Sequence, residues 1–141
     1  MSRLSWEDYF MEIAQVTAKR ATCARRQVGC VIVDHRGYML SAGYNGLPSG
    51  FPHCIDQPCE GASCSSGTGL DLCQSIHAEQ NAIARLREPF EARSMFVTTA
   101  PCMSCTKLAL ATGIQEVVFK SDYPASGKAL WESAGRLWRQ V

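Results

Sequence analysis

Residues 77–83 read HAEQNAI, and residues 101–105 read PCMSC. Apolar residues recur at helical spacing through the first stretch and beyond it, which predicts a helix over residues 77–87. The second stretch opens with a proline, a residue suited to the first turn of a helix, and a helix is expected over residues 101–112. Gly113 follows this second pattern directly and suits the end of a helix. The two motifs therefore stand at the starts of two predicted helices.

Strands and helices alternate through the rest of the second half of the chain. Apolar and β-branched residues predict strands over residues 94–99 and 116–120. A further helix is expected over residues 125–134, and a last short strand over residues 137–141. Because strands that alternate with helices are joined by crossover connections, we expect parallel strand pairing in this half.

The first half of the chain predicts a helix followed by a hairpin. A helical pattern runs over residues 5–21, with Ser5 as its expected cap. The face expected to pack on the sheet consists of Trp6, Tyr9, Phe10, Ile13 and Thr17. Strands over residues 28–33 and 38–44 flank a turn and form an antiparallel hairpin. Together the two halves predict an α/β fold, with a mixed sheet and helices on both faces, in a single domain over residues 1–141.

The composition is that of an ordinary globular protein. Of the 141 residues, 46% are hydrophobic and 19% are charged, and the formal net charge is +1. A charge this close to neutral does not predict a general binder of nucleic acid or membranes. No apolar run approaches the ~20 residues that span a bilayer. Residues 1–8 carry charges and no apolar signal-peptide stretch, so a cytoplasmic location is expected.

Eight cysteines are distributed as metal ligands are, rather than as a disulfide framework. In a reducing compartment, thiols bind metals or stay reduced more often than they form disulfides. Several of these cysteines crowd into residues 45–75, a long segment rich in Gly, Pro and Ser. A loop of this length inside a compact domain is unusual unless it is functional or held in place. A metal ion would provide that constraint.

The H-x-E and P-C-x-x-C motifs together are the signature of zinc deaminases. Zinc takes nitrogen and thiolate ligands, and a catalytic site uses three of them and leaves the fourth position to water. His77, Cys102 and Cys105 provide these three ligands. Cysteines in the first turn of a helix also lie at the positive end of its dipole, which favours the thiolate.

Glu79 is expected to act as the general acid and base. Zinc lowers the pKa of its water toward ~7, and a glutamate can take the water's proton and pass it to the ring nitrogen of a cytosine. Water then attacks C4, and the same carboxyl protonates the leaving ammonia. Inside a regular helix a two-residue spacing would separate His77 from Glu79, so both must lie at the very start of the helix. A purely structural zinc site is the alternative.

Five stretches of the chain resemble the cytidine/deoxycytidylate deaminase family. They are QVGCVI at 27–32, GYNGLP at 43–48, HAEQNAI at 77–83, TGIQEVV at 112–118 and SDY at 121–123. The resemblance runs from about Trp6 to Leu137, with Thr112 where the family usually has alanine. The G-Y-N-G-x-P turn is similar to that of the deoxycytidylate (dCMP) deaminase branch.

The resemblance implies a three-layer α/β/α sandwich around a five-stranded mixed sheet. It implies hydrolytic deamination of dCMP to dUMP, which feeds thymidylate synthesis. Asn45 would contact the nucleotide near the sugar or base, the backbone of Ala78 would bind the pyrimidine edge, and Tyr123 would pack on or bond to the substrate. Asn45 followed by glycine also suits a simple turn, which is the alternative reading.

Regulation is implied by the same resemblance. In many members dCTP activates and dTTP inhibits, each with Mg²⁺, and the regulatory site lies between subunits of a homohexamer. The residues implied at this site are Gly43, Tyr44, Asn45 and Gly46.

A substrate phosphate needs a cation, and four basic residues cluster before the first predicted strand. They are Lys19, Arg20, Arg25 and Arg26. Arginine suits phosphate because its planar guanidinium presents a fork of donors, and Arg26 is the preferred candidate. A solvated surface is the alternative for this cluster.

Some dCMP deaminases carry a second, structural zinc, and this sequence has cysteines at similar places. The implied ligands are Cys23, Cys54, Cys73 and Cys59, with Cys64 or His53 as alternatives to Cys59. Such a site would pin the long loop beside the active site. Reduced, partly buried thiols are the alternative.

Other functions remain open. The same motifs suit a deaminase of another cytosine nucleotide or nucleoside, of guanine, or of a tRNA adenosine, although a tRNA enzyme would need a broader basic surface. Outside catalysis, the chain could be a zinc-stabilised binding module or a subunit that keeps only a regulatory nucleotide site. Neither of these has a need for Glu79, which is present.

Overall fold

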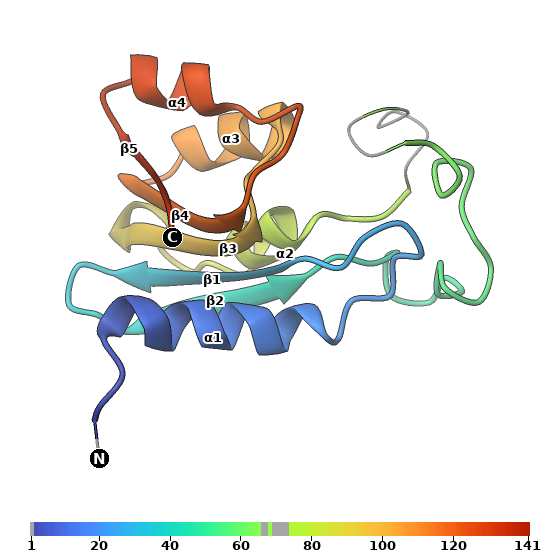
Figure 1. The fold of residues 1–141 in the computed structure, drawn as a ribbon, viewed down its shortest axis with the longest axis horizontal. Helices are drawn as coiled ribbons and strands as arrows, with labels where there is room; N and C mark the ends of the chain where they lie inside the picture. Colours follow the sequence, from blue (N-terminus) through green and yellow to red (C-terminus); the bar gives the residue numbers. More distant parts are fainter. Residues whose placement is uncertain (1, 66–67, 69–73) are drawn as a thin grey trace.

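The computed structural model describes residues 2–65, 68 and 74–141 (Figure 1). The strands are β1 (Gly29–Asp34), β2 (Met39–Tyr44), β3 (Ala92–Thr99), β4 (Glu116–Ser121) and β5 (Leu137–Gln140). The helices are α1 (Trp6–Ala18), α2 (Ala78–Ala84), α3 (Met103–Leu110) and α4 (Lys128–Ser133), with a short 3-10 helix η2 (Pro89–Glu91). Each predicted element is present, and η2 was not predicted.

All five strands form one mixed sheet in the order β2-β1-β3-β4-β5. β1 pairs antiparallel with both β2 and β3, which confirms the hairpin. β3 pairs parallel with β4, and β4 pairs parallel with β5. The chain crosses over through α3 and α4 between these parallel strands, as the alternation of elements predicted.

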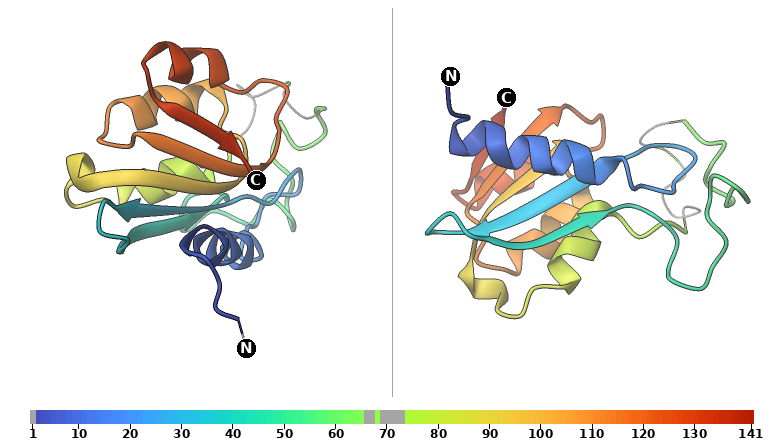
Figure 2. Two further views of the ribbon diagram at one scale, coloured as in Figure 1. Left: turned by 60° about the vertical axis from the view of Figure 1, so that its left-hand side comes forward. Right: turned by 90° about the horizontal axis from the view of Figure 1, so that it is seen from below.

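Helices cover both faces of the sheet and form a three-layer sandwich (Figure 2). On one face, Phe10 and Ala14 of α1 pack against Val31 and other sheet residues. On the opposite face, α2, α3 and α4 contribute to a larger core that includes the fully buried Trp131. β1 lies inside the sheet between β2 and β3, and all six of its residues are buried because both of its faces are covered. The predicted α/β/α architecture is confirmed.

The prediction of which α1 residues pack on the sheet is wrong for the first turn of this helix. Ser5 caps the helix as expected, since its hydroxyl accepts a hydrogen bond from the Asp8 backbone N–H at 3.0 Å. However, Trp6 and Tyr9 are 63% and 44% exposed. Their rings pack against each other and against Phe10 instead of against the sheet. Helical spacing identified a stripe of apolar residues but not which part of it the sheet covers.

The long loop is present, and an arginine holds part of it. Residues 47–65 contain no helix or strand and project from one end of the sandwich (Figures 1 and 2). The Arg25 guanidinium donates to the backbone carbonyls of Gly61, Ser65 and Thr68. A side-chain cation therefore provides some of the constraint that the sequence analysis assigned to a metal. Among the described residues, no helix has the length and apolar character needed to cross a bilayer.

Gly43 permits the close approach of α2 to β2. A Cβ at this position would lie 2.5 Å from the Ala78 carbonyl oxygen and 2.6 Å from the Ala82 nitrogen. Both are backbone atoms, so they cannot move aside without displacing the helix. We expect Gly43→Ala to lower the free energy of unfolding by about 1–3 kcal/mol, the usual cost of overpacking. Urea denaturation measures this change, and an unaltered midpoint would show that α2 is not held this closely.

Candidate active site

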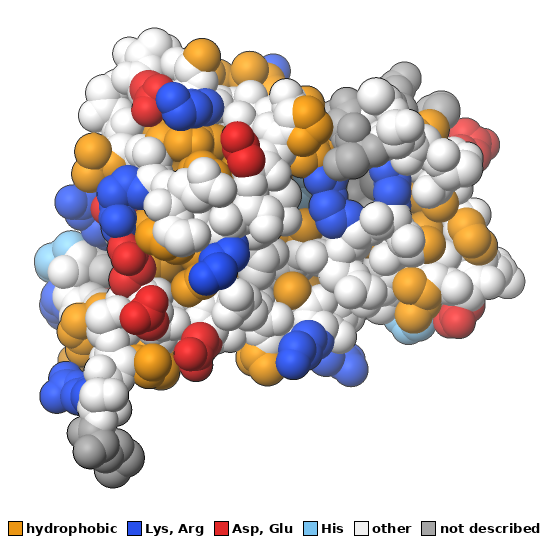
Figure 3. Space-filling view, viewed as in Figure 1, with side chains coloured by type: hydrophobic (Ala, Val, Ile, Leu, Met, Phe, Trp, Pro, Cys, Tyr) orange, Lys and Arg blue, Asp and Glu red, His pale blue; other side chains and the backbone are white. Residues whose placement is uncertain are grey.

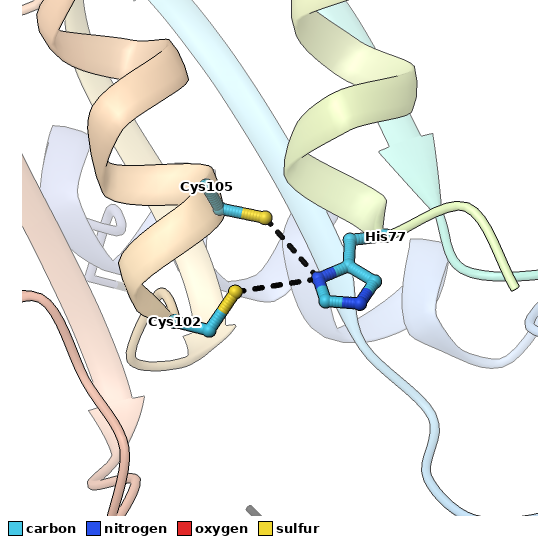
Figure 4. A group of neighbouring side chains, drawn as sticks. All are labelled: His77, Cys102 and Cys105. Carbon is cyan, nitrogen blue, oxygen red and sulfur yellow. Dashed lines mark hydrogen bonds between the residues drawn. The ribbon is translucent and has the colours of Figure 1, made fainter. Parts of the chain in front are cut away.

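Two helix starts bring three potential metal ligands together (Figure 4). His77 is the N-cap of α2, Cys102 is the N-cap of α3, and Cys105 lies in the first turn of α3. The His77 Nδ1 atom lies 3.2 Å from the Cys105 Sγ and 3.5 Å from the Cys102 Sγ. All three ligand atoms lie within 4.8 Å of one another. One imidazole nitrogen and two thiol sulfurs are a donor set that suits zinc.

The structure places Cys102 slightly differently from the prediction. The helix expected from residue 101 begins at Met103, and Pro101 precedes the N-cap. The Pro101 carbonyl accepts a hydrogen bond from the Gly127 N–H at 3.1 Å, which holds it in the strand-to-helix turn. Cys102 and Cys105 still face the same point, because an N-cap side chain lies beside the third residue of its helix.

Hydrogen bonds from neighbouring residues fix the ligands. The Gln80 Oε1 accepts a hydrogen bond from the His77 backbone N–H at 2.8 Å, which is one of the two hydrogen bonds of a capping box. The buried Thr106 hydroxyl donates to the Cys102 carbonyl at 2.8 Å. Ile76, directly before His77, exchanges two backbone hydrogen bonds with Gly46. These hydrogen bonds hold the backbone of His77 and of Cys102 in place, and with it the points from which the two ligand side chains extend.

The two thiols are electrostatically unequal. The hydrogen bond from Cys105 lowers the pKa of the Cys102 thiol to about 4, with a further contribution from His77. The same hydrogen bond and burial raise the pKa of Cys105 well above the usual value. The hydrogen bond to Cys102 in turn raises the pKa of His77. The geometry thus favours a thiolate on Cys102 at neutral pH, which is the form that binds metal.

Glu79 is the second residue of α2 and only 5% exposed. Burial raises the pKa of its carboxyl to about 7. A carboxyl with this pKa can both accept and donate a proton near neutral pH, as a general acid and base must. His77 as N-cap and Glu79 in the first turn also meet the requirement that both residues lie at the start of the helix.

One cavity, of about 530 Å³ with its open mouth included, connects these groups with the predicted substrate residues. Its lining includes His77, Glu79, Cys102, Arg26, Asn45, Ala78 and Tyr123. Thr99 and Ala100 also line it, and sequence reasoning missed both. Their position at the end of β3 was the available signal, because ligands of α/β sheets bind beyond the carboxyl ends of strands.

The basic cluster divides among different tasks. Arg26 lies with its guanidinium carbon 4.3 Å from the centre of the Tyr123 ring. Arg25 also lines the cavity, but its guanidinium donates to loop carbonyls. Arg20 lies over the Tyr44 ring, and Lys19 is the C-cap of α1. The guanidinium of Arg26, the preferred phosphate ligand, therefore lies against Tyr123 in the cavity wall, whereas that of Arg25 is bound to the loop.

The Tyr123 hydroxyl is buried and has no hydrogen-bond partner among the described residues. Tyr123 itself is 5% exposed and lines the cavity. Buried polar groups are normally satisfied, so an unpaired hydroxyl on a cavity wall is suited to a ligand.

The predicted second zinc site is only partly visible. Cys23 and Cys54 are buried, and the Ile55 N–H donates to the Thr22 carbonyl, so their segments are adjacent. The Cys59 N–H donates to the Cys54 sulfur at 3.4 Å. Cys73 lies outside the described residues. Within the described part of the chain, His77, Cys102 and Cys105 are the only group of three clustered ligands, so the second zinc stays a prediction.

The predicted regulatory residues divide between two cavities. Gly43, Tyr44 and Gly46 line a second cavity of about 990 Å³ including open space, whereas Asn45 lines the first. Asn45 follows the end of β2 at Tyr44, and its side chain is turned toward the backbone of Arg26 and Val28. Asn81 of α2 and Arg85, the C-cap of that helix, also line the second cavity and were not predicted.

Comparison with known proteins identifies the family. The family model of the cytidine and deoxycytidylate deaminase zinc-binding region matches residues 4–121 of this sequence. Deoxycytidylate deaminase of Schizosaccharomyces pombe is 38% identical over 98% of this chain and 44% of its own length. That of Mycobacterium phage D29 is 36% identical over 86% of this chain and 99% of its own length. This chain thus spans less than half of the yeast relative.

A solved structure shows the same fold. The dCMP deaminase of cyanophage S-TIM5, in complex with dCMP and dUMP, has a TM-score of 0.81 with 24% sequence identity. The similarity covers 100% of both chains. From its matched family model, its relatives and its histidine–cysteine–cysteine site, this chain belongs to the cytidine and deoxycytidylate deaminase family.

Proposed function

We propose that this chain catalyses the zinc-dependent hydrolytic deamination of dCMP to dUMP and ammonia. The observation that carries the proposal is the joining of three groups in one cavity. These groups are His77 and Cys102 of the ligand set, which the buried Cys105 completes behind the cavity wall, the buried Glu79 carboxyl and the Arg26 guanidinium. Relatives named deoxycytidylate deaminase support the choice of substrate.

His77 Nδ1 and the sulfurs of Cys102 and Cys105 would hold the zinc ion. When bound, zinc lowers the pKa of a water molecule toward neutrality and so supplies the nucleophile. Glu79 accepts a proton from the water and delivers it to the ring nitrogen of cytosine. The deprotonated water adds to C4, and Glu79 then takes the proton of the new C4 hydroxyl and passes it to the amino group, so that the C4–N bond breaks, ammonia leaves and the C4 carbonyl forms. The pKa of about 7 supports both directions of transfer.

The remaining wall of the cavity would bind the nucleotide. Arg26 contacts the phosphate, and Tyr123 packs on the substrate and satisfies its buried hydroxyl there. Ala78, fully buried at the start of α2, presents its backbone to the pyrimidine edge. Asn45 lines the same wall, and a contact near the sugar or base is the role that the family resemblance implies for it.

Regulation by nucleoside triphosphates is part of the proposal. Activation by dCTP and inhibition by dTTP, each with Mg²⁺, would act through the cavity that Gly43, Tyr44 and Gly46 line, between subunits of a homohexamer. The positive charge of Arg85 in this cavity supports binding of an anion. We also infer a cytoplasmic enzyme that binds no nucleic acid. On the face seen in Figure 3, basic and acidic side chains are interspersed, which supports the latter inference.

Substrate choice is tested by incubating the protein with dCMP, CMP, deoxycytidine and cytidine in parallel, with and without dCTP–Mg²⁺. Loss of cytosine absorbance is expected for dCMP and is expected to increase with dCTP. Arg26→Ala should raise KM for dCMP by roughly tenfold or more, because it removes a charge-assisted contact. Turnover of the nucleosides alone would refute the dCMP assignment, and zinc-loaded protein inactive on all four would redirect attention to guanine, tRNA or non-enzymatic roles.

Glu79→Gln removes the proton carrier while it keeps the shape of the side chain. We expect normal zinc content and a fall in kcat of about 10²–10⁴-fold, the usual contribution of general acid–base catalysis. Glu79→Ala should give a similar loss. Steady-state kinetics and metal analysis measure both effects. A near-normal rate in either variant would be incompatible with the mechanism.

Cys102→Ala removes one of three zinc ligands. Because the remaining histidine and cysteine form an incomplete set, zinc and activity should be lost together. Metal analysis of the purified variant gives the direct answer, with Ser104→Ala, at an exposed position of the same helix turn, as a control that should keep both. Full zinc occupancy at the active site of Cys102→Ala would show that another residue is the ligand.

A further inference from the structure

Asn45 is 7% exposed, and its side-chain amide binds backbone groups on both sides of Gln27. The Oδ1 atom accepts from the Val28 N–H at 2.8 Å. The Nδ2 atom donates to the Arg26 carbonyl at 2.8 Å. Both hydrogen bonds have good length, so this one amide holds the segment that leads from Arg26 into β1.

The Asn45 backbone is itself held firmly. Its carbonyl accepts a hydrogen bond from the Thr22 N–H at 3.1 Å. The next residue, Gly46, is paired with Ile76 through hydrogen bonds of 2.8 and 3.1 Å. The amide therefore extends from a fixed strand end and can fix what it binds.

The fixed segment carries the predicted phosphate ligand. The Arg26 backbone is held at its carbonyl by Asn45, and its guanidinium lies over the Tyr123 ring at 4.3 Å. A long, flexible side chain is placed accurately only if both its backbone and its head group are restrained. Asn45 restrains the first of these and Tyr123 the second.

We propose that Asn45 is a positioning residue for Arg26, and that it sets the preference of the enzyme for a nucleotide over a nucleoside. This inference rests on the proposed function, in which Arg26 contacts the phosphate. It differs from a sugar or base contact by Asn45, because such a contact would be used equally by dCMP and deoxycytidine. An effect that passes through Arg26 is confined to the substrate that carries a phosphate.

The test compares dCMP and deoxycytidine as substrates of the full chain loaded with zinc. The proteins are the unaltered enzyme, Asn45→Ala, Arg26→Ala and the double variant. With Asn45→Ala, we expect kcat/KM for dCMP to fall roughly tenfold further than kcat/KM for deoxycytidine, mostly through KM. The double variant should be no worse on dCMP than Arg26→Ala, because the two residues act as one unit.

Two further variants guard against a merely structural effect. Asn45→Asp keeps the acceptor for Val28 but loses the donor to Arg26, and it should show the same dCMP-specific loss if Asn45→Ala does not fold. Asn81→Ala is the matched control. Its amide also holds a neighbouring backbone group, donating to the Tyr44 carbonyl at 2.8 Å, but it binds no part of the Arg26 segment. It should change the two substrates by the same factor.

Equal losses on dCMP and deoxycytidine in the Asn45 variants would overturn the inference and favour a direct contact. Losses that multiply in the double variant would overturn it as well. If Arg26→Ala itself shows no dCMP-specific loss, the phosphate assignment in the proposed function fails, and the inference fails with it. The first two outcomes leave that assignment intact, so the two failures are distinguishable.

Discussion

The meeting of two helix starts at one end of the sheet is the constraint on which the site depends. His77 and Cys102 are N-caps of different helices, yet their ligand atoms and that of Cys105 lie within 4.8 Å of one another. This convergence requires α2 to approach β2 closely, which Gly43 permits. It also requires α3 to start directly after β3, where Pro101 turns the chain. The sheet register, the helix packing and the caps all serve this one juxtaposition.

Local patterns in the sequence predicted much of this arrangement. The spacing of HAEQNAI and PCMSC indicated both helix starts and the three ligands, because caps and helical periodicity are local properties. Alternating elements predicted the parallel half of the sheet. The exposure of Trp6 and Tyr9 was not predictable in this way, because it depends on where the sheet ends beneath α1. The second zinc and the roles of Asn45, Ala78, Tyr123 and the regulatory residues came from resemblance, whereas that of Arg26 came from the cluster of basic residues. All of these remain predictions.

Long-range contacts explain what local patterns missed. Arg25 binds carbonyls 36 to 43 residues away in the sequence, and no motif signals this. The division of Gly43–Gly46 between two cavities likewise follows from the position of the strand end in the fold. The short segment from Tyr44 to Gly46 thus separates the cavity beside Glu79, where we propose that the substrate binds, from a second cavity. Hydrogen bonds tie this segment to α2 and to the residue before His77. A ligand in the second cavity would therefore contact the same short segment, Tyr44 to Gly46, that helps to position residues of the first cavity.

Zinc-edge anomalous diffraction from crystals of the zinc-loaded protein tests the central claim most directly, because it locates each ion separately. We predict a peak that places a zinc ion about 2.0–2.1 Å from His77 Nδ1 and about 2.3 Å from the sulfurs of Cys102 and Cys105, with no fourth protein ligand. Such a site keeps a position for water beside Glu79. A fourth protein side chain on this ion, or no peak among these three residues, would contradict the account.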